Sequence, residues 1–380
     1  MTRTCLILLL ACAVLSAQRT EEYDRSVVSQ VRIDLRELGY PPADVIPSDE
    51  SAVRSLTVAP SGVLYGATSG KRSHLFTLDP LHGYVVPLGF LKGVTAVHRS
   101  LVVSEAGDVY IGAGDADGRL LKYTPRRVRA IRVDAALEVA DLGAPAAGEG
   151  IFCLAIDRPR GVIYGLSSPN GQFFSYSIAG AKFTLHGRVA ERRIPGEKFE
   201  NEKAIGRAIA VSEDGGVFTS GENGALYRFD PGKQQLEKLP LSVPSVPGRE
   251  AYNRVDAFAW GSRDTLYGGT SDGYLFRLNT KARRLDNLGK PLNQYRIRGL
   301  VWSPNGKLYG VGGDDDEMAR LFSFRPGGTY ELLGMVDVNR RPFYAWQAYV
   351  IDALAIGLDG TIYLGQAERK SKLYLYHPTP

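Results

Sequence analysis

This sequence has little cysteine, with 3 residues in 380. Cys5 and Cys12 lie in an apolar N-terminal segment, so Cys153 is the single cysteine of the remaining chain. A lone cysteine excludes an intramolecular disulfide framework and a cysteine pair for zinc. The fold must therefore be stabilised by its core. We expect Cys153 to be a small buried residue, because no histidine or basic residue stands close in sequence to activate it.

The sequence also lacks a large excess of charge of either sign. The net charge is +5, from 46 basic and 41 acidic residues, and no basic tail or block occurs. This distribution argues against a nucleic-acid partner. Motifs for metals and phosphate-binding loops are missing too, so we expect no metal and no cofactor. The segment 114–118 begins with the spacing of a calcium loop but lacks the later acidic ligand, and 314–317 is similarly acidic. We expect both to be solvated turns.

Long hydrophobic runs occur only at the N-terminus. Arg3 precedes an apolar stretch at 5–15 that is too short to span a bilayer, and Leu15-Ser16-Ala17 ends it with small residues. This pattern predicts a secretory signal peptide at 1–17, cleaved after Ala17, then a linker at 18–29. Lipid anchoring at Cys12 is the alternative, but the apolar run continues past that residue. We therefore expect a secreted or periplasmic protein without a transmembrane span.

Glycine and tyrosine are abundant, with 43 and 20 residues against 3 methionines, which favours strands and tight turns. A short motif of apolar residues around an aromatic recurs seven times. Its aromatics are Tyr65, Tyr110, Tyr164, Phe218, Tyr267, Tyr309 and Tyr363. A turn residue stands three positions before each of them, and a polar loop and a second alternating strand follow. Four short strands per repeat of this length are typical of a propeller blade.

The sequence thus predicts an all-β, seven-bladed propeller over residues 30–380, and we expect a monomer. The blades are placed at about 51–90, 94–143, 148–190, 204–243, 253–290, 295–336 and 348–380. The seventh repeat lacks its fourth strand. Residues 30–39 carry the same alternation and the same Leu-Gly ending, so we expect them to pair beside 373–376 and to close the ring. Closure would also remove two free sheet edges.

The repeat resembles the broad group of seven-bladed propellers that includes WD40-like and YVTN-type proteins and secreted carbohydrate-active propellers. The resemblance is to architecture. The Trp-Asp ending of WD40 blades, the double glycine of kelch blades and the Tyr-Trp-Thr-Asp of receptor propellers are all absent. The resemblance therefore implies a fold and no catalytic residue.

Propellers bind ligands at the mouth formed by the loops that enter the innermost strands. Aligning the repeats on their aromatics places seven residues at one level, just before the innermost strands. They are Arg54, Arg99, Phe152, Arg207, Asp256, Arg298 and Asp352. Arginine presents a planar fork suited to carboxylate, sulfate or phosphate groups, so this ring predicts a site for an anionic ligand. Alternatively, its arginines and aspartates pair with one another and tie the blades together.

Aromatic residues and one histidine stand near the predicted mouth. We expect Tyr344 and Trp346 to wall the ligand site, and we name Tyr252, Tyr295, Tyr349 and His98 as catalytic candidates. Two functions remain open. One is a non-catalytic module that binds an anionic polysaccharide or a protein partner. The other is a polysaccharide lyase on a uronic-acid polymer, in which arginine neutralises the carboxylate and a tyrosine or histidine moves the proton.

Overall fold

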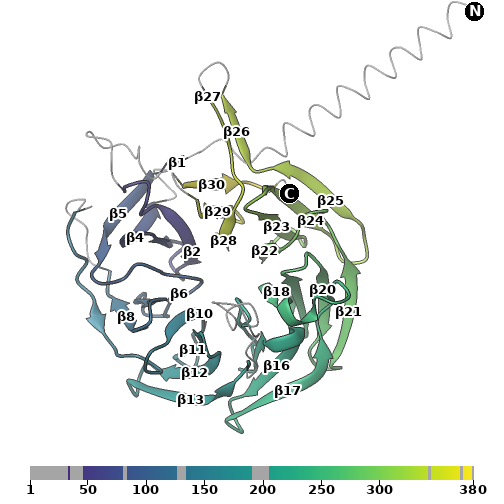
Figure 1. Cartoon of the computed structure of the whole chain (residues 1–380), viewed down its shortest axis with the longest axis horizontal. Coiled ribbons are helices and arrows are strands. Elements are labelled where there is room, and N and C mark those ends of the chain that lie inside the picture. The colour runs from purple at the N-terminus through teal and green to yellow at the C-terminus, as the bar shows by residue number, and fades with distance from the viewer. Residues whose placement is uncertain are drawn as a thin grey trace, which may run out of the picture.

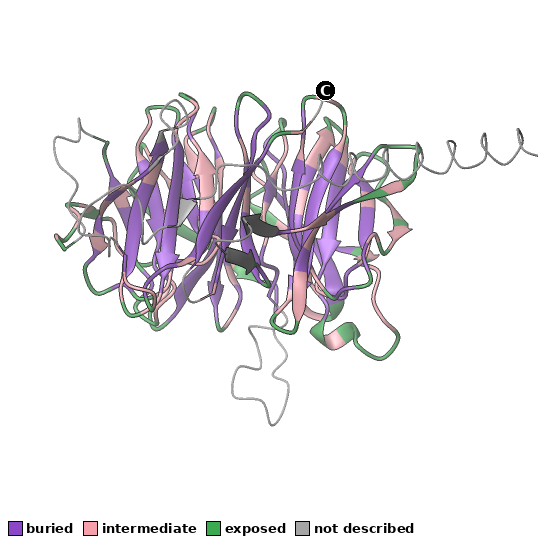
Figure 2. Cartoon of the chain, turned by 90° about the horizontal axis from the view of Figure 1, so that it is seen from above, coloured by how far each residue is buried: buried purple, intermediate pink, exposed green. Residues whose placement is uncertain are grey.

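The computed structural model describes residues 33–34, 46–79, 84–125, 134–190, 205–340, 344–368 and 371–378. Seven antiparallel sheets surround a central axis, and each corresponds to one sequence repeat (Figure 1). The predicted all-β, seven-bladed propeller is therefore confirmed. Buried strands run between two faces of more exposed loops (Figure 2). Within the described residues, no helix is long and apolar enough to cross a membrane.

The first three blades are sheets of four consecutive strands. The first contains β2 (Ala52–Val58), β3 (Leu64–Ser69), β4 (Ser73–Asp79) and β5 (Tyr84–Leu91). The second contains β6 (Leu101–Val103), β7 (Val109–Gly112), β8 (Leu120–Tyr123) and β9 (Ala140–Asp141). The third contains β10 (Gly150–Asp157), β11 (Val162–Ser168), β12 (Gln172–Ser177) and β13 (Lys182–Arg188).

The next three blades repeat this order. The fourth contains β14 (Ala210–Val211), β15 (Val217–Ser220), β16 (Ala225–Asp230) and β17 (Gln235–Ser242), with the 3-10 helix η1 (Glu222–Gly224) before β16. The 3-10 helix η2 (Glu250–Tyr252) precedes the fifth, which contains β18 (Val255–Ser262), β19 (Thr265–Thr270), β20 (Leu275–Asn279) and β21 (Arg284–Gly289). The sixth contains β22 (Ile297–Trp302), β23 (Leu308–Asp314), β24 (Glu317–Phe324) and β25 (Tyr330–Met335).

The seventh blade contains β28 (Ile351–Ile356), β29 (Ile362–Gln366) and β30 (Lys372–Tyr376). A two-residue strand, β1 (Ile33–Asp34), pairs antiparallel with β30 through Leu373 and Lys372. The rest of the predicted closing segment 30–39 lies outside the described residues, so closure of the ring by this segment stays a prediction. A separate hairpin, β26 (Asp337–Arg340) and β27 (Tyr344–Gln347), extends outward from the ring between the sixth and seventh blades (Figure 1).

The repeated aromatics pack between neighbouring blades. Tyr110, Tyr267, Tyr309 and Tyr363 are each 2% exposed. In the third blade, Tyr164 stacks on Phe173 with ring centroids 6.0 Å apart, and it also contacts Phe229 of the fourth blade at 5.7 Å. One aromatic per blade thus joins two sheets, which explains why the repeat keeps this position apolar and large.

The glycine after the repeated aromatic has a steric role in four blades. It pairs with a phenylalanine of the third strand, and the phenylalanine ring lies directly over it. A Cβ atom added at Gly268 would lie 2.1 Å from Cζ of Phe276. The equivalent pairs are Gly66 with Phe76, Gly165 with Phe174 and Gly310 with Phe322. The tyrosine-glycine motif therefore combines a large residue on one face with an unfilled position on the other.

Candidate functional site

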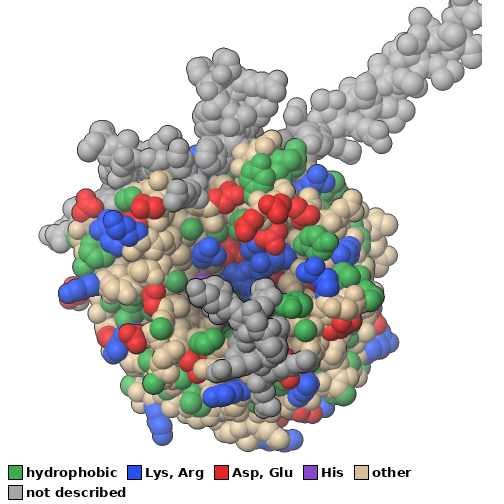
Figure 3. Space-filling model, in the orientation of Figure 1, with side chains coloured by type: hydrophobic (Ala, Val, Ile, Leu, Met, Phe, Trp, Pro, Cys, Tyr) green, Lys and Arg blue, Asp and Glu red, His purple; other side chains and the backbone are tan. Residues whose placement is uncertain are grey.

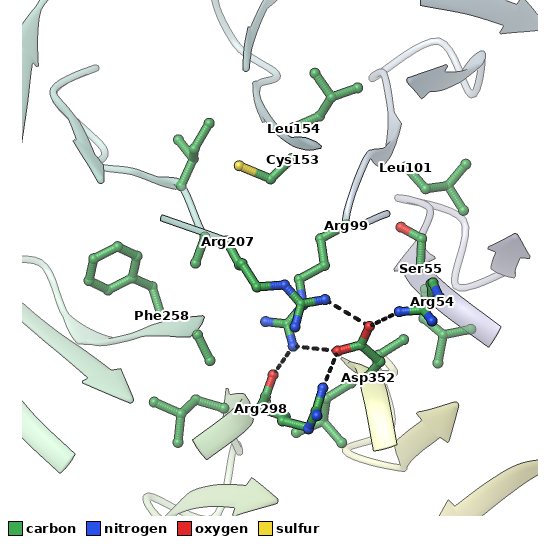
Figure 4. A pocket seen from close by; sticks show the side chains of 18 residues that line it. Arg54, Ser55, Arg99, Leu101, Cys153, Leu154, Arg207, Phe258, Arg298 and Asp352 are labelled. Atoms are coloured by element: carbon green, nitrogen blue, oxygen red, sulfur yellow. Dashed lines mark hydrogen bonds and ion pairs between the residues drawn. The ribbon is translucent and has the colours of Figure 1, made fainter. Parts of the chain in front are cut away.

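A cavity of about 170 Å³ lies on the axis at the mouth of the ring (Figure 4). Its upper part is lined by Arg54, Arg99, Arg207, Arg298 and Asp352. Two positions further along the innermost strands, every blade contributes an apolar residue to the lining. These are Leu56, Leu101, Leu154, Ile209, Phe258, Leu300 and Leu354. The cavity therefore has a charged level at the mouth and an apolar level beneath it.

Local β-bulges occur at most of the ring positions. In five blades the pairing register between the innermost and second strands shifts at the ring position. The residues at these shifts are Arg54, Phe152, Asp256, Arg298 and Asp352. A bulge leaves one residue unpaired and re-aims its side chain. The sequence prediction that these residues stand before the strands is therefore wrong for these five, which lie inside them.

One carboxylate receives all four ring arginines. Arg54 Nη1 lies 3.1 Å from Asp352 Oδ2, and Arg207 Nη2 lies 2.7 Å from the same oxygen. Arg298 Nη1 and Arg99 Nη2 lie 3.1 Å and 3.4 Å from Oδ1. The side chain of Asp352 is fully buried. Residues from the first, second, fourth and sixth blades thus meet one residue of the seventh (Figure 4).

The second ring aspartate has different partners. Asp256 accepts from Nε of Arg254 at 3.3 Å and from Nε of Arg296 at 2.8 Å. Both arginines stand two residues before a ring position, and the sequence analysis missed them. Only the backbone carbonyl of Asp256 reaches the ring, where it accepts a hydrogen bond from Arg99. The ring arginines therefore pair with the ring aspartates, but all four side chains contact Asp352 and none contacts the side chain of Asp256 within the described residues.

Arginines outnumber carboxylates in this region. We define the central cluster as Arg54, Arg99, Arg207, Arg254, Arg296, Arg298, Asp256, Asp314 and Asp352. Asp314 joins it through contacts with Arg298 and, at 4.0 Å, with Arg296. Six arginines against three aspartates leave three positive charges in excess. Figure 3 shows basic side chains gathered where the axis meets this face, with acidic side chains beside them.

Burial and mutual repulsion shift the pKa values of the cluster. Burial, with repulsion from Arg207, lowers the pKa of Arg99 to about 10. Burial also lowers the pKa of Arg254 to about 9, although Asp256 opposes this shift. For Asp352, burial alone would raise the pKa, but Arg207, Arg99 and Arg298 outweigh it and hold the pKa well below its usual range. Burial is thus the main cause of the lowered pKa values of Arg99 and Arg254, whereas Asp256 outweighs burial at Arg296 and raises its pKa.

Two guanidinium nitrogens of the cluster are buried without a hydrogen-bond partner among the described residues. They are Nε of Arg99 and Nη2 of Arg296. A buried donor without a partner carries a desolvation cost, and the cost is larger for a charged group. The excess of positive charge favours an anion at this place, whereas these two nitrogens are buried away from solvent.

His98 stands beside the cluster, as predicted. Burial, together with repulsion from Arg207 and Arg54, lowers its pKa to about 4, so the imidazole is neutral at pH 7. Its ring meets the edge of Phe152 with centroids 5.3 Å apart. Phe152, the single apolar ring member, also lies beneath Arg207, whose Cζ is 6.0 Å from the ring centroid.

The predicted tyrosines do not line the cavity. Tyr252, Tyr295 and Tyr349 are 36%, 48% and 38% exposed, and none is among the lining residues. Arg249 lies over the ring of Tyr295 at 5.3 Å. The backbone of Tyr344 and Trp346 lies in β27, in the hairpin that extends away from the ring, which corrects their predicted place at the mouth. A position just upstream of an innermost strand therefore brings a side chain to the channel in some blades, as for Arg99 and Arg207, and not in others.

The acidic loops hold the mouth in shape. Asp115 accepts the backbone N–H of Thr95 at 2.9 Å, and Glu317 accepts that of Tyr295 at 3.0 Å. Asp272 and Glu368 do the same for Val246 and Tyr349, at 2.9 Å and 3.1 Å. In four blades an acidic residue after the second strand thus anchors the loop that enters the first. The turns at 114–118 and 314–317 are partly exposed, as expected for solvated turns, and their acidic side chains also hold neighbouring loops.

The described residues offer neither a reactive thiol near the cavity nor a set of metal ligands. Cys153 is buried, and burial raises the pKa of its thiol to about 12, so it stays protonated. This agrees with the expected small buried residue. In the part of the chain that the structure describes, no group of three or more His, Cys, Asp or Glu residues is placed to hold a metal ion.

No protein-family model and no curated protein matches this sequence. Solved structures do match the fold. A catalytically inactive variant of virginiamycin B lyase from Staphylococcus aureus, solved with quinupristin, has a TM-score of 0.63 and 12% identity, over 88% of this chain and 97% of the lyase. The WD40 propeller domain of Doa1 matches with a TM-score of 0.55 and 12% identity, over 87% and 94%.

A third match is the extracellular domain of the B. thetaiotaomicron protein BT4673, described as a hybrid two-component system. Its TM-score is 0.62 and its identity 17%, over 88% of this chain but 39% of that one. At such identities these likenesses show a shared propeller fold. They agree with the resemblance to WD40-like propellers that the repeat predicts.

Proposed function

We propose that this protein is a secreted propeller-type binding module that holds an anionic ligand at the mouth of its ring. The ligand is an acidic glycan or an acidic segment of a protein partner. The observation that carries this proposal is the central cluster, in which six arginines share three aspartates. An anion would offset the excess charge and would accept hydrogen bonds from guanidinium donors.

The surroundings of the cluster strengthen such an interaction. Arg207 and Arg298 are 6% and 5% exposed, and the level beneath them is apolar. Charges in a cleft with low-dielectric walls act over a longer range than charges on an open surface, and they raise the local concentration of counter-ions. The mouth thus supports attraction of anionic ligands better than scattered surface lysines would.

We propose a lyase as the second candidate. The observation that favours it is the neutral imidazole of His98 beside Arg54 and Arg207. A neutral histidine can accept a proton, and the arginines would stabilise the charge that develops on a neighbouring carboxylate. A lyase with the same fold, the S. aureus enzyme, is among the structural matches. On this hypothesis the polymer would contain uronic acid, and His98 would be the base.

We also propose that residues 30–39 complete the seventh blade. Pairing of Ile33 with Leu373 and of Asp34 with Lys372 supports this assignment. Removal of residues 18–39 should then lower the unfolding temperature of the chain. An unchanged unfolding temperature would mean that this segment contributes nothing to closure.

The binding proposal is tested by incubating the mature chain with polygalacturonate, alginate, hyaluronan and polyglutamate, with uncharged dextran as the control. We expect a rise in unfolding temperature with at least one polyanion, none with dextran, and a loss of the effect as salt screens the charges. Absence of any shift or binding with every polyanion, and with small anions as well, would overturn the proposal.

A matched pair of variants locates the effect. Arg54 and Arg277 have similar exposure, 35% and 38% of the side chain, and each contacts one aspartate. Arg277 lies on β20, outside the central cluster, and contacts Asp286 on the neighbouring β21. We expect Arg54→Gln to weaken polyanion binding and Arg277→Gln to leave it unchanged. Ultraviolet absorbance of new unsaturated uronate ends tests the lyase candidate, for which His98→Gln should abolish turnover and spare binding.

A further inference from the structure

We infer that the central cavity binds one compact dianionic oxyanion of the phosphate class in preference to a carboxylate. This inference rests on the proposed function and makes its ligand more specific. Two forms of the group share this chemistry. One is free inorganic phosphate, and the other is a phosphomonoester at the end of a larger ligand. The inference follows from the size of the cavity, its charge and the arginines that line it.

The size of the cavity sets an upper limit on the ligand. A volume of about 170 Å³ is smaller than the several hundred Å³ of typical sites for drug-sized molecules. A tetrahedral oxyanion has five heavy atoms and is small enough for this space. A longer ligand would place an end group here.

The charge of the cavity selects among groups of that size. The central cluster carries three positive charges in excess, and four of its arginines line the cavity with Asp352 alone. A carboxylate or a sulfate ester brings a single negative charge. A phosphate group brings about 1.5 to 2 negative charges near pH 7 and three strong acceptor oxygens. A dianion therefore offsets more of the excess than a carboxylate does.

The donors of the cavity are placed for several oxygens at once. Each guanidinium has five N–H groups in a rigid fork. Arg54 gives Nη1 and Arg207 gives Nη2 to Asp352. Arg99 gives Nη1 and Nη2 to the backbone carbonyls of Asp256 and Arg298. These three side chains reach the cavity from the first, second and fourth blades (Figure 4). Donors that converge from several blades suit a tetrahedral group better than a planar carboxylate.

Asp352 prepares this arrangement. Its two oxygens hold all four lining arginines at 2.7 to 3.4 Å. Long side chains that are fixed before binding lose less conformational freedom on binding. The aspartate thus acts as a positioning residue, since it orients the four arginines and takes one nitrogen each from Arg54 and Arg207.

The test is isothermal titration of the full mature chain at pH 7.5 and constant ionic strength, in a phosphate-free buffer. The probes are inorganic phosphate, glucose 6-phosphate, acetate and glucuronate. We expect at least one phosphate probe to bind about ten-fold or more tightly than both carboxylates, since a charge-assisted hydrogen bond contributes about that much. Tighter binding of the ester than of inorganic phosphate would identify an end group as the source, and the reverse would identify the free ion.

Variants locate the binding. Arg54→Gln should weaken phosphate about ten-fold, and Arg207→Lys, which keeps the charge but loses the fork, should weaken it as well. Arg277→Gln should have no effect. Equal weakening by Arg277→Gln would place the anion elsewhere and overturn the inference.

The remaining outcomes separate this inference from the proposed function. Carboxylates that bind as tightly as phosphate would overturn the preference for a dianion and leave an anionic-ligand site in place. Binding of acidic polymers without any binding of phosphate would do the same. If neither phosphate, nor carboxylate, nor any acidic polymer binds, both the inference and the proposed function are wrong.

Discussion

Arg207 Nη2 lies 2.7 Å from Asp352 Oδ2, although the two residues are 145 positions apart and belong to the fourth and seventh blades. The contact spans the central channel, and three further arginines meet the same carboxylate. The side chain of one aspartate is therefore the electrostatic centre of the mouth. Several measurable properties of the protein depend on it.

Replacing this aspartate should destabilise the fold strongly. In Asp352→Asn the four arginines lose their shared counter-ion, and removing one member of a buried ion pair costs about 3 to 5 kcal/mol. Urea-induced unfolding measures the change in free energy. Asp286→Asn is the control, because Asp286 is 31% exposed and a surface pair contributes about 0 to 1 kcal/mol. Equal effects of the two variants would contradict the central role of Asp352.

The same carboxylate should shape the acid limit of stability. Its pKa is held well below the ordinary value of about 3.9 by Arg207, Arg99 and Arg298, against the opposing effect of burial. A lowered folded-state pKa contributes stability that is present above the unfolded value and is lost as pH falls through the folded value. We expect no contribution to the slope between pH 5 and 8 and a decline below about pH 4. Unfolding free energies of Asp352→Asn should fall less steeply there, and an identical slope in both proteins would sink the idea.

His98 gives a second and separate pH dependence. Burial and the nearby arginines lower its pKa to about 4, against about 6.5 in the unfolded chain. The folded protein thus binds fewer protons, so this contribution to stability is complete above about pH 6.5 and is lost as pH falls toward 4. NMR titration of the imidazole should give a midpoint near 4. In His98→Gln the stability slope between about pH 6.5 and 4 should decrease, with His74 and His186 left to account for what remains, since burial lowers the pKa of both.

The architecture could be predicted from the sequence because each blade repeats the same packing demand. An aromatic between sheets, a glycine under a phenylalanine and a turn glycine recur at fixed spacing, so local pattern and global fold agree. The level of the ring residues followed from the same alignment. The contacts within the ring could not be predicted in the same way, because they depend on which arginine side chains, from several blades, reach the carboxylate oxygens of Asp352.

Two parts of the site escaped prediction for identifiable reasons. The bulges depend on register between strands, and a single strand's pattern does not show register. Arg254 and Arg296 stand two residues before ring positions in only two blades, so they are not part of the repeat; for Arg254, its place two residues before the ring residue Asp256 is a signal in the sequence. The three tyrosines lie outside the cavity lining because closeness in sequence to a ring residue does not ensure closeness to the channel.

Filling the space under the phenylalanine should be costly. In Gly268→Ala the new Cβ would lie 2.1 Å from Phe276 Cζ, so the ring or the strand must move. Overpacking of this kind costs about 1 to 3 kcal/mol. Thermal unfolding measures it, with Gly232→Ala as a control whose nearest atom is 3.3 Å away on the side chain of Asp230. Adding Phe276→Leu to Gly268→Ala should recover part of the loss; a strictly additive double variant would argue against this contact.

The acidic anchors of the mouth should act locally. Glu317→Gln weakens the charge-assisted hydrogen bond to the Tyr295 amide, which is exposed and far from the core. Hydrogen exchange at the Tyr295 amide should therefore become faster. The global unfolding temperature should change little, because the bond lies at the surface. Unchanged exchange at this amide would show that the loop is held by other contacts.

The order of the cluster along the chain affects how it assembles. Arg54, Arg99, Arg207 and Arg298 all precede Asp352, the acceptor that they share. Domains are synthesised and begin to fold from the N-terminus. A growing chain therefore displays several arginines on unfinished blades before their counter-ion has left the ribosome. The four arginines therefore gain their shared counter-ion only when the seventh blade joins the first six.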